Sequence, residues 1–561
     1  MIMQFDLLKQ KPFFLTEEAL AWVRDTYNSM SLEEKIGQLF CPWVATDEKA
    51  ELQELTDRYH IGGILLRELP AEKSRSVQAT LQSLSKIPLL SSANLETGGR
   101  GSVYEGTFLG RQMAIAATSD AQSAYELGHI GAREAKAVGV NWAFAPVVDI
   151  DFNDRNPITN VRTYGADPAA VLEMASAFCC GCMEEGVAPT IKHFPGDGVD
   201  DRDQHLVTSI NTLSCEDWDE TYGRIYRSLI DQGVLSVMAA HIALPAYEKR
   251  LGGEQHAIVP ATCSKVLLQS LLRGQLGFNG LITTDATTMI GFCSYLPREQ
   301  LVPLCIEAGC DVLLICKDLE EDYRFMLEGY QKGLLSAERL EDAVLRILAT
   351  KAALGLHRKR IVNAEEMSVI GCEEHQRIAE QIVDRAITLV KDTQQLLPIN
   401  AAKHRRVLLE VMGEGSDREA AEETWDQLLT EKGFLVTRYI PEPGFELPVG
   451  NVTSFKQQYD LVLYVVLSDA ASNNTTVRLH WHTVWGWGNN TPWFVKDVPT
   501  LMVSMGNPYH LLDAPMIQTY INTYCYSPLY AKRTLEKLLG VSSFKGQSPV
   551  DPFCGRLDTR Q

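Results

Sequence analysis

The sequence predicts two successive α/β domains, the first of which is built on parallel strands. Its 561 residues exceed the size of one ordinary domain. Short apolar runs, typical of strands that are buried on both faces, alternate with helical patterns up to residue 356. The same alternation starts again after residue 404, so a second domain of the same class is expected there.

Eight apolar segments of the first domain have the length expected of strands. They are residues 37–44, 61–67, 87–95, 140–150, 187–194, 235–244, 280–289 and 311–316. Helical patterns separate them, with a cap predicted at Thr16 and a capping box at Ser31-Leu32-Glu33-Glu34. Such alternation is typical of a closed (β/α)8 barrel or of an open doubly wound sheet, and periodicity alone does not decide between them.

The predicted boundaries give a barrel-like domain at 1–356, a helical connector at 357–404 and an α/β domain at 405–561. Residues 319–356 continue the helical pattern of the first domain, and residues 365–391 predict one long amphipathic helix in the connector. The last domain is predicted to be a three-layer sandwich with a parallel sheet. Its strands are expected at 407–412, 435–440, 461–467, 500–505 and 519–524, with helices at 418–429 and 529–539.

Composition argues for a globular protein that avoids anionic polymers. Hydrophobic residues make up 45% of the chain and the formal net charge is −20, so nucleic acid and anionic membranes are poor partners. The N-terminal residues lack a signal-peptide pattern and no run is long enough to span a bilayer, so a cytoplasmic location is expected. Among the thirteen cysteines, Cys179, Cys180 and Cys182 lack a second pair at zinc spacing, and reduced thiols without a metal are expected.

The stretch 187–209 concentrates the reactive side chains. A short apolar strand ends in Lys192-His193, and Phe194-Pro195-Gly196 then interrupts any regular ladder. An acidic loop follows, with Asp197, Asp200, Asp201, Asp203 and His205. A strand that ends in titratable groups and opens into such a loop is typical of the catalytic end of a barrel strand, whereas the alternative is a solvated loop after a core strand.

These residues carry a family resemblance. Lys-His-Phe-Pro-Gly at 192–196 resembles glycoside hydrolase family 3, and Asp203-Gln204-His205 resembles its β-N-acetylglucosaminidase branch. The resemblance covers nearly the whole chain and extends to the run at 499–509 and to the closing 544–552. It implies a (β/α)8 barrel, possibly irregular, followed by the sandwich domain, and thereby decides against the open sheet.

The resemblance also assigns the groups that would break a glycosidic bond. Asp285, at the end of the strand in Thr-Thr-Asp-Ala-Thr-Thr-Met, resembles the family nucleophile that forms a glycosyl-enzyme. His205 is the acid/base candidate because histidine titrates near neutrality, and Asp203 can orient and charge it. A histidine departs from the usual two-carboxylate plan, so carboxylate spacing does not predict the stereochemistry. The alternative for Asp285 is an ordinary loop aspartate.

Four further positions match family residues that hold sugar hydroxyls: Arg162, Lys192, His193 and Asn94. Asn94 stands where the family commonly has an aspartate, in Asn-Leu-Glu-Thr-Gly-Gly-Arg with one extra residue, and it carries no charge. A surface ion pair for Arg162 and a core hydrogen bond for His193 are the alternatives. His241 ends the sixth strand, where lining the site and a structural role are equally expected.

The resemblance implies a retaining, exo-acting glycosidase that removes terminal β-linked N-acetylglucosamine without a cofactor, as a monomer or homodimer. A β-glucosidase or β-xylosidase of the same family is one alternative, and a catalytically silent sugar-binding protein is another. Because a deprotonated histidine is neutral, phosphate is expected to compete with water for the glycosyl-enzyme. Four tryptophans, Trp481, Trp485, Trp487 and Trp493, either cover the barrel mouth or pack internally.

Overall fold

The chain folds into two compact units. The computed structural model describes residues 2–252, 258–358, 361–440, 451–468, 470–472, 474–475, 478–481 and 490–561. The first unit comprises Met1–Phe108, Ala121–Thr159 and Ala166–Arg377, and the second comprises Leu109–Asp120, Asn160–Gly165 and Ile378–Gln561. The division after residue 377 falls inside the segment 357–404 that is predicted as a connector.

A closed parallel barrel forms the first unit, and each of the eight predicted segments supplies one strand position among the described residues. They are β1/β2 (Phe40–Cys41 and Trp43–Val44), β3 (Gly63–Leu66), β4 (Leu90–Ala93), β5 (Trp142–Ala143), β6 (Ala188–Phe194), β8 (Ser236–Ala239), β10 (Leu281–Thr284) and β11 (Leu313–Leu314). Pro42 has no N–H and divides the first strand in two. Pairing runs from β2 through β3, β4, β5, β6 and β8 to β10. The ring closes because β11 pairs with β1 and is bridged to β10 through Thr283 and Val312, so the open sheet is excluded.

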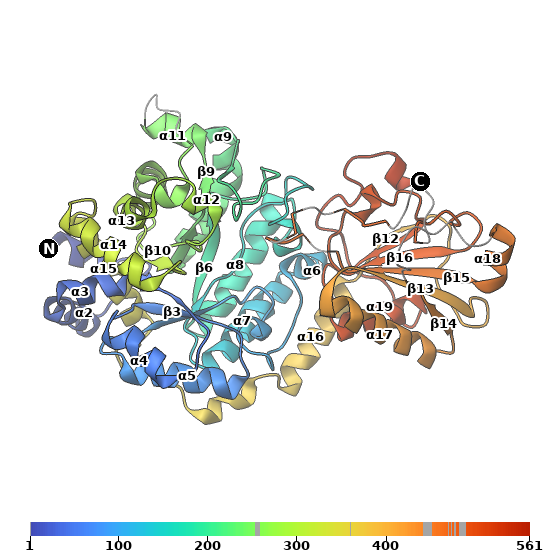
Figure 1. Ribbon diagram of the computed structural model, residues 1–561, viewed down its shortest axis with the longest axis horizontal. Coiled ribbons are helices and arrows are strands. Elements are labelled where there is room, and N and C mark those ends of the chain that lie inside the picture. The colour runs from blue at the N-terminus through green and yellow to red at the C-terminus, as the bar shows by residue number, and fades with distance from the viewer. Residues whose placement is uncertain are drawn as a thin grey trace. The chain divides into compact units, whose positions relative to one another are not determined.

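Helices follow the strands and surround the barrel (Figure 1). They are α1 (Ile2–Leu8), α2 (Glu17–Ser29), α3 (Leu32–Gln38), α4 (Lys49–Asp57), α5 (Ala71–Leu84), α7 (Ala121–Ala137), α8 (Pro168–Glu184), α9 (Cys215–Trp218), α10 (Arg224–Gln232), α11 (Pro245–Gly252), α12 (Ile290–Cys293), α13 (Arg298–Ala308), α14 (Leu319–Gln331) and α15 (Ala337–Ala353). Both predicted caps are present: Thr16 accepts from the Ala19 N–H at 3.3 Å, and Ser31 and Glu34 form a capping box. Each cap satisfies backbone donors that the first helical turn leaves open.

A six-stranded sheet forms the second unit, in the order β12-β17-β16-β15-β13-β14. The strands are β12 (Thr388–Asp392), β13 (Arg406–Met412), β14 (Leu435–Arg438), β15 (Leu461–Val466), β16 (Thr500–Ser504) and β17 (Thr519–Asn522). All pairs are parallel except β12 with β17. Every strand predicted for this domain is therefore present, and β12 is an addition.

The long helix predicted at 365–391 is wrong at both ends. A 3-10 segment occupies Ala364–Val369, α16 spans Glu373–Ala386, and residues 388–392 form the edge strand β12. Gly371 has a φ of +62°, which breaks the helical path before α16. Hydrogen bonding of β12 to β17 outweighs the helical pattern of this segment, which is an example of tertiary context overriding local propensity.

Both faces of the second sheet are covered. Alternate residues such as Leu408, Tyr464 and Met502 pack on one face against the irregular segments around Phe494 and Leu511. Helices α17 (Gly415–Glu431) and α19 (Pro528–Leu538) lie on the other face (Figure 1). This arrangement is the predicted sandwich, with one outer layer that is largely irregular in the described residues.

Two of the four loop tryptophans are described, and both pack within the second unit. Trp481 contacts Tyr464 edge-on at 6.2 Å between ring centroids, and Trp493 lies 5.2 Å from the ring of Phe455. These contacts support the internal packing alternative for Trp481 and Trp493. Trp485 and Trp487 lie outside the described residues.

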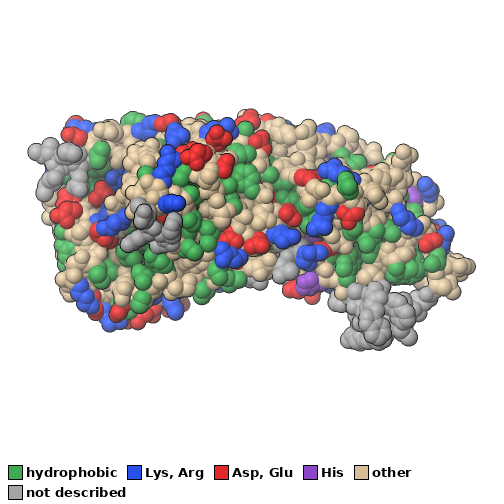
Figure 2. Space-filling model, turned by 90° about the horizontal axis from the view of Figure 1, so that it is seen from above, with side chains coloured by type: hydrophobic (Ala, Val, Ile, Leu, Met, Phe, Trp, Pro, Cys, Tyr) green, Lys and Arg blue, Asp and Glu red, His purple; other side chains and the backbone are tan. Residues whose placement is uncertain are grey.

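Charges of both signs are interspersed over the described part of the face drawn in Figure 2. No helix among the described residues combines the length and the apolar character needed to cross a membrane. All thirteen cysteines are free thiols, including Cys179, Cys180 and Cys182 on α8. Within the described ranges, no group of three histidine, cysteine or acidic side chains is arranged to hold a metal ion.

Candidate active site

The candidate residues of the first unit gather at the carboxyl ends of the barrel strands. Asn94 follows β4, Lys192 and His193 are near the C-terminal end of strand β6, and Asp285 follows β10 directly. In a parallel barrel all these ends meet on one face, which is the usual location of barrel chemistry. Arg162 lies in the 3-10 turn Asn160–Arg162, which belongs to the second unit, so its predicted contact with the sugar stays a prediction.

Asp285 is a partly accessible carboxylate at the end of β10. Its Oδ1 accepts a hydrogen bond of 2.7 Å from the Ala286 N–H, and its own N–H donates to the Ala239 carbonyl at 2.8 Å. Burial tends to raise its pKa, but the potential of His193, His241 and His205 outweighs burial, and the net pKa of Asp285 is lowered. An ionised carboxylate of this kind is suited to nucleophilic attack.

His205 and Asp203 form a closely bonded pair on the loop after β6. His205 Nδ1 lies 2.6 Å from Asp203 Oδ1, which also accepts the His205 backbone N–H at 2.8 Å. The Asp203 side chain is 1% exposed, whereas that of His205 is 31% exposed. Because the aspartate occupies Nδ1, the other ring nitrogen, Nε2, is left for proton exchange with a ligand. Asp203 Oδ2 is buried and has no hydrogen-bond partner among the described residues.

The loop that carries this pair is fixed to the segment after Asp285. The Ile290 N–H at the start of α12 donates to the His205 carbonyl at 2.8 Å. Gly291 permits this approach, since a Cβ there would lie 2.3 Å from the Gln204 carbonyl oxygen and 2.7 Å from that of Val207. A short parallel pair, β7 (Ser209–Ile210) with β9 (Ile242–Ala243), fixes the end of the same loop.

Lys192 is almost fully buried and faces two side chains from the loop after β4. Its Nζ lies 2.8 Å from Glu96 Oε1 and 3.4 Å from Asn94 Oδ1, and its side chain is 4% exposed. The structure therefore brings together two of the predicted sugar-binding residues. Sequence reasoning missed Glu96, although it lies in the same Asn-Leu-Glu-Thr motif, two residues after Asn94.

His193 is oriented by a buried aspartate that sequence reasoning also missed. Its Nδ1 lies 2.6 Å from Asp149 Oδ2, and its backbone N–H donates to Asp149 Oδ1 at 3.1 Å. Asp149 Oδ1 also accepts the Asp197 N–H at 2.8 Å. Asp149 is the first carboxylate at the end of the predicted strand 140–150, so the rule that singles out Asp285 would have found it.

His241 supports the backbone next to Asp285. Its side chain is fully buried, its Nδ1 lies 3.0 Å from Thr262 Oγ1, and its Nε2 lies 3.0 Å from the Ala286 carbonyl oxygen. Burial lowers the pKa of His241, which favours the neutral ring that donates from Nε2 to that carbonyl. Both ring nitrogens are engaged, so of the two predicted roles the structural one fits His241, and the ring holds the backbone beside Asp285.

A strand-end carboxylate, a histidine–aspartate pair and a buried lysine on one barrel face are groups suited to an enzyme that works by nucleophilic attack and proton transfer. The family model described as "Glycosyl hydrolase family 3 N terminal domain" matches residues 31–350. The chain belongs to glycoside hydrolase family 3, and the resemblance seen in its sequence is confirmed.

Relatives and solved structures extend this likeness beyond the barrel. A β-N-acetylglucosaminidase/β-glucosidase of Cellulomonas fimi is 44% identical, over 98% of this chain and 99% of that protein. A β-hexosaminidase of Nitrosomonas eutropha is 31% identical, over 46% of this chain and 74% of that protein.

Among solved structures, β-glucoside phosphorylase BglX bound to 2FGlc superposes with a TM-score of 0.93 at 43% identity, over 98% of this chain and 100% of that one. A family 3 β-N-acetylglucosaminidase from Paenibacillus sp. str. FPU-7 has a TM-score of 0.79 at 26% identity, over 93% and 99%. These comparisons establish a family 3 glycosidase with two domains.

Proposed function

We propose that the protein is a retaining, exo-acting glycosidase that removes terminal β-linked N-acetylglucosamine, with β-glucosides as its second substrate class. The observation that carries this proposal is the 2.6 Å contact between His205 Nδ1 and Asp203 Oδ1, on a loop fixed to the segment that follows Asp285. The Asp-x-His motif supports the amino sugar. The names of the Cellulomonas fimi relative and of BglX support the glucoside.

In the first step, an Asp285 oxygen attacks the anomeric carbon as the bond to the leaving oxygen breaks. The proton on His205 Nε2 moves to that oxygen, so the alcohol leaves neutral and the imidazole ring becomes neutral. Asp203 Oδ1, 2.6 Å from His205 Nδ1, fixes the orientation of the ring for this transfer. In the proposed reaction Lys192, Asn94 and His193 hold the sugar hydroxyls during the attack. Glu96 orients Lys192, and Asp149 orients His193.

In the second step, an acceptor O–H attacks the same carbon on the glycosyl-enzyme, and His205 Nε2 takes its proton. The Asp285 carboxylate is released and the sugar keeps its original anomeric configuration. Water as acceptor gives the free sugar. Phosphate is a second candidate acceptor, because the deprotonated base is neutral and does not repel an anion as a carboxylate would. The printed name of BglX, a phosphorylase, supports this candidate.

Two measurements test these proposals. A panel of chromogenic β-glycosides that differ only at the 2-substituent should show turnover of the N-acetylamino sugar, and equal or exclusive turnover of another sugar would overturn the assigned substrate. Product analysis in the presence of millimolar phosphate should show sugar 1-phosphate next to free sugar. If sugar 1-phosphate never appears as phosphate rises, the protein is a hydrolase.

A further inference from the structure

A cavity of about 440 Å³ lies at the opposite end of the barrel from Asp285. It is bordered by residues that precede β8 and β10 and by the N-terminal segment around Lys11. Asn279, on the cavity wall, stands six positions before Asp285, which corresponds to roughly 20 Å along an extended strand. The cavity volume falls within the range of small-molecule sites, and its distance from the strand ends makes it independent of the proposed active site.

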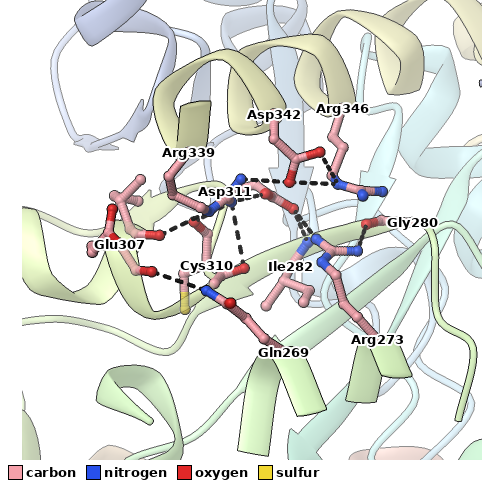
Figure 3. Close-up of polar contacts among 12 residues, drawn as sticks. Gln269, Arg273, Gly280, Ile282, Glu307, Cys310, Asp311, Arg339, Asp342 and Arg346 are labelled. Atoms are coloured by element: carbon pink, nitrogen blue, oxygen red, sulfur yellow. Dashed lines mark hydrogen bonds and ion pairs between the residues drawn. The ribbon is translucent and has the colours of Figure 1, made fainter. Parts of the chain in front are cut away.

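Two arginines that line this cavity, Arg273 and Arg346, share two carboxylates with a third arginine, Arg339 (Figure 3). Arg273 Nη2 lies 2.8 Å from Asp311 Oδ2, and Arg339 contacts both Asp311 and Asp342. Arg346 Nε lies 3.1 Å from Asp342 Oδ1. Three positive and two negative groups leave one uncompensated positive charge. Each carboxylate is already shared between two arginines, because Arg339 contacts both Asp311 and Asp342. Neither carboxylate can therefore neutralise the excess positive charge.

Burial makes the excess positive charge of this cluster more costly. The Arg346 side chain is 7% exposed and that of Arg273 is 15% exposed. Burial, followed by the like charge of Arg346, lowers the pKa of Arg273 to about 9. An unpaired buried charge is costly, and a bound anion would offset the cost.

Three residues that line the cavity carry donors for such an anion. Arg346 uses Nε for Asp342 and Nη1 for the carbonyl and side-chain oxygens of Asn279, while its Nη2 has no partner among the described residues. Figure 3 shows the far end of this guanidinium directed away from Asp342. The Gly277 N–H likewise has no partner within the described ranges, and the space beside its Cα is open. Lys11, whose side chain is 40% exposed, adds a cation at the cavity; its Nζ lies 3.3 Å from Asp231 Oδ1 and donates to the Asp231 carbonyl at 2.8 Å.

We propose that this cavity binds a small phosphate-bearing anion, either inorganic phosphate or a hexose phosphate. A guanidinium, a lysine and a backbone N–H are the donor set that phosphate groups use in proteins, and the cavity has room for a sugar attached to the phosphate. The arginines also bond to backbone carbonyls at this end of the barrel, for example Arg273 Nη1 to Gly280 at 2.9 Å. Occupation of the cavity is therefore expected to stabilise the barrel, and the inference does not depend on the proposed reaction.

Titration calorimetry with the full chain tests this proposal, using inorganic phosphate, hexose 6-phosphate and acetate at matched ionic strength. Saturable phosphate binding is expected in the wild type and in Asp285→Ala, and Lys11→Glu should weaken it by about tenfold or more. The matched control is Lys9→Glu, which makes the same charge change two residues away at a lysine paired with Glu17 and outside the cavity. Lys11→Glu should leave the turnover of a chromogenic substrate in phosphate-free buffer unchanged.

Three results would overturn the proposal: no saturable binding, equal weakening by Lys9→Glu and Lys11→Glu, or equal binding of acetate. Binding of only one of the two phosphate compounds would identify the source of the phosphate group and support the site. Arg346→Gln provides a second variant with the same expected loss. Arg346 also holds Asn279, so its replacement can disturb the fold. Phosphate binding by Arg346→Gln therefore counts only if this variant unfolds at the wild-type temperature. If it does not, Lys11→Glu alone tests the proposal.

Discussion

The side-chain oxygen of Gln204 accepts a hydrogen bond of 3.1 Å from the backbone N–H of His241. On its other side, the Gln204 amide Nε2 reaches Asp197 Oδ2 at 3.4 Å, and the side chain is fully buried. Gln204 stands between Asp203 and His205 in the chain, so its two contacts determine where both members of the pair lie. Gln204 is therefore a positioning residue for the acid/base group in the proposed reaction.

Gln204→Ala should lower kcat/KM by about tenfold to hundredfold for a phenyl glycoside, because general acid catalysis by a displaced His205 is lost in part. A dinitrophenyl glycoside needs no proton on its leaving group, so its kcat/KM should fall by less than about threefold. Steady-state kinetics on both substrates measure the difference. Gln232→Ala, at an exposed glutamine bonded to Ser176, is the control. Equal losses on the two substrates would mean that Gln204 has only a structural role.

Asp203→Asn should reduce the turnover of a phenyl glycoside by about a hundredfold, since the protonated His205 ring loses its anionic partner and its fixed orientation. The kcat/KM of a dinitrophenyl glycoside, whose leaving group needs no proton, should fall by less than about threefold. Steady-state kinetics on both substrates measure the two losses. Asp201→Asn, at an exposed aspartate of the same loop, should keep the wild-type kcat/KM on both. An unchanged kcat/KM of Asp203→Asn would show that the two residues do not act as a pair.

Asp285→Ala should abolish turnover, with a loss of about a thousandfold or more, because the covalent intermediate cannot form. The variant should stay folded, because Asp285 is only partly buried and its side chain accepts a single hydrogen bond, from the Ala286 N–H. Azide added to the variant can enter the space left by the carboxylate and attack from the same side. It should then restore activity towards a dinitrophenyl glycoside and yield a glycosyl azide of inverted configuration, which NMR of the product identifies. Wild-type rates without azide would contradict the assignment.

The fold could be predicted from the sequence because each barrel strand carries its own signal. Apolar runs such as Val187–Ile191 are continuous, and the caps at Thr16 and Ser31 depend on local hydrogen bonds alone. Closure of the barrel could not be predicted in this way, since it depends on the contact between β11 and β1, which are about 270 residues apart in the chain. Strand β12 was missed for the same reason, because only its pairing with β17 makes it a strand.

The candidate site was predictable where a residue lies in a motif, as with Asp203, His205 and Asp285. The residues that support these motifs, Gln204, Glu96 and Asp149, were not identified, because their roles depend on contacts across the barrel. Gln204 stands inside the Asp-x-His motif, yet its function follows from the distant Asp197 and His241. Glu96 and Asp149 were also missed, although Glu96 follows the predicted strand 87–95 and Asp149 lies at the end of the predicted strand 140–150.

Lys351 on α15 is a buried cation with an unusual environment. Its side chain is fully buried, and its Nζ donates to Gln38 Oε1 at 2.5 Å. Burial lowers the pKa of Lys351 from 10.5 to about 7. The folded state therefore releases this proton near neutrality, whereas the unfolded state keeps it up to pH 10.5. Between these two values the unfolded state binds the extra proton, so the contribution of Lys351 to the free energy of unfolding rises with pH.

Lys351→Met should therefore raise the free energy of unfolding near neutral pH, and its advantage should shrink by about 1 kcal/mol or more per pH unit as the pH rises towards 10.5. Loss of the bond to Gln38 costs about 1–3 kcal/mol, but that cost is the same at every pH and does not affect the trend. Urea denaturation of the wild type and of Lys351→Met, at neutral pH and about two pH units higher, measures how the difference in the free energy of unfolding changes with pH. Lys332→Met is the control, at a lysine that is 62% exposed and paired with Glu328. A difference between wild type and Lys351→Met that stays constant with pH would show that Lys351 keeps its proton in the folded protein.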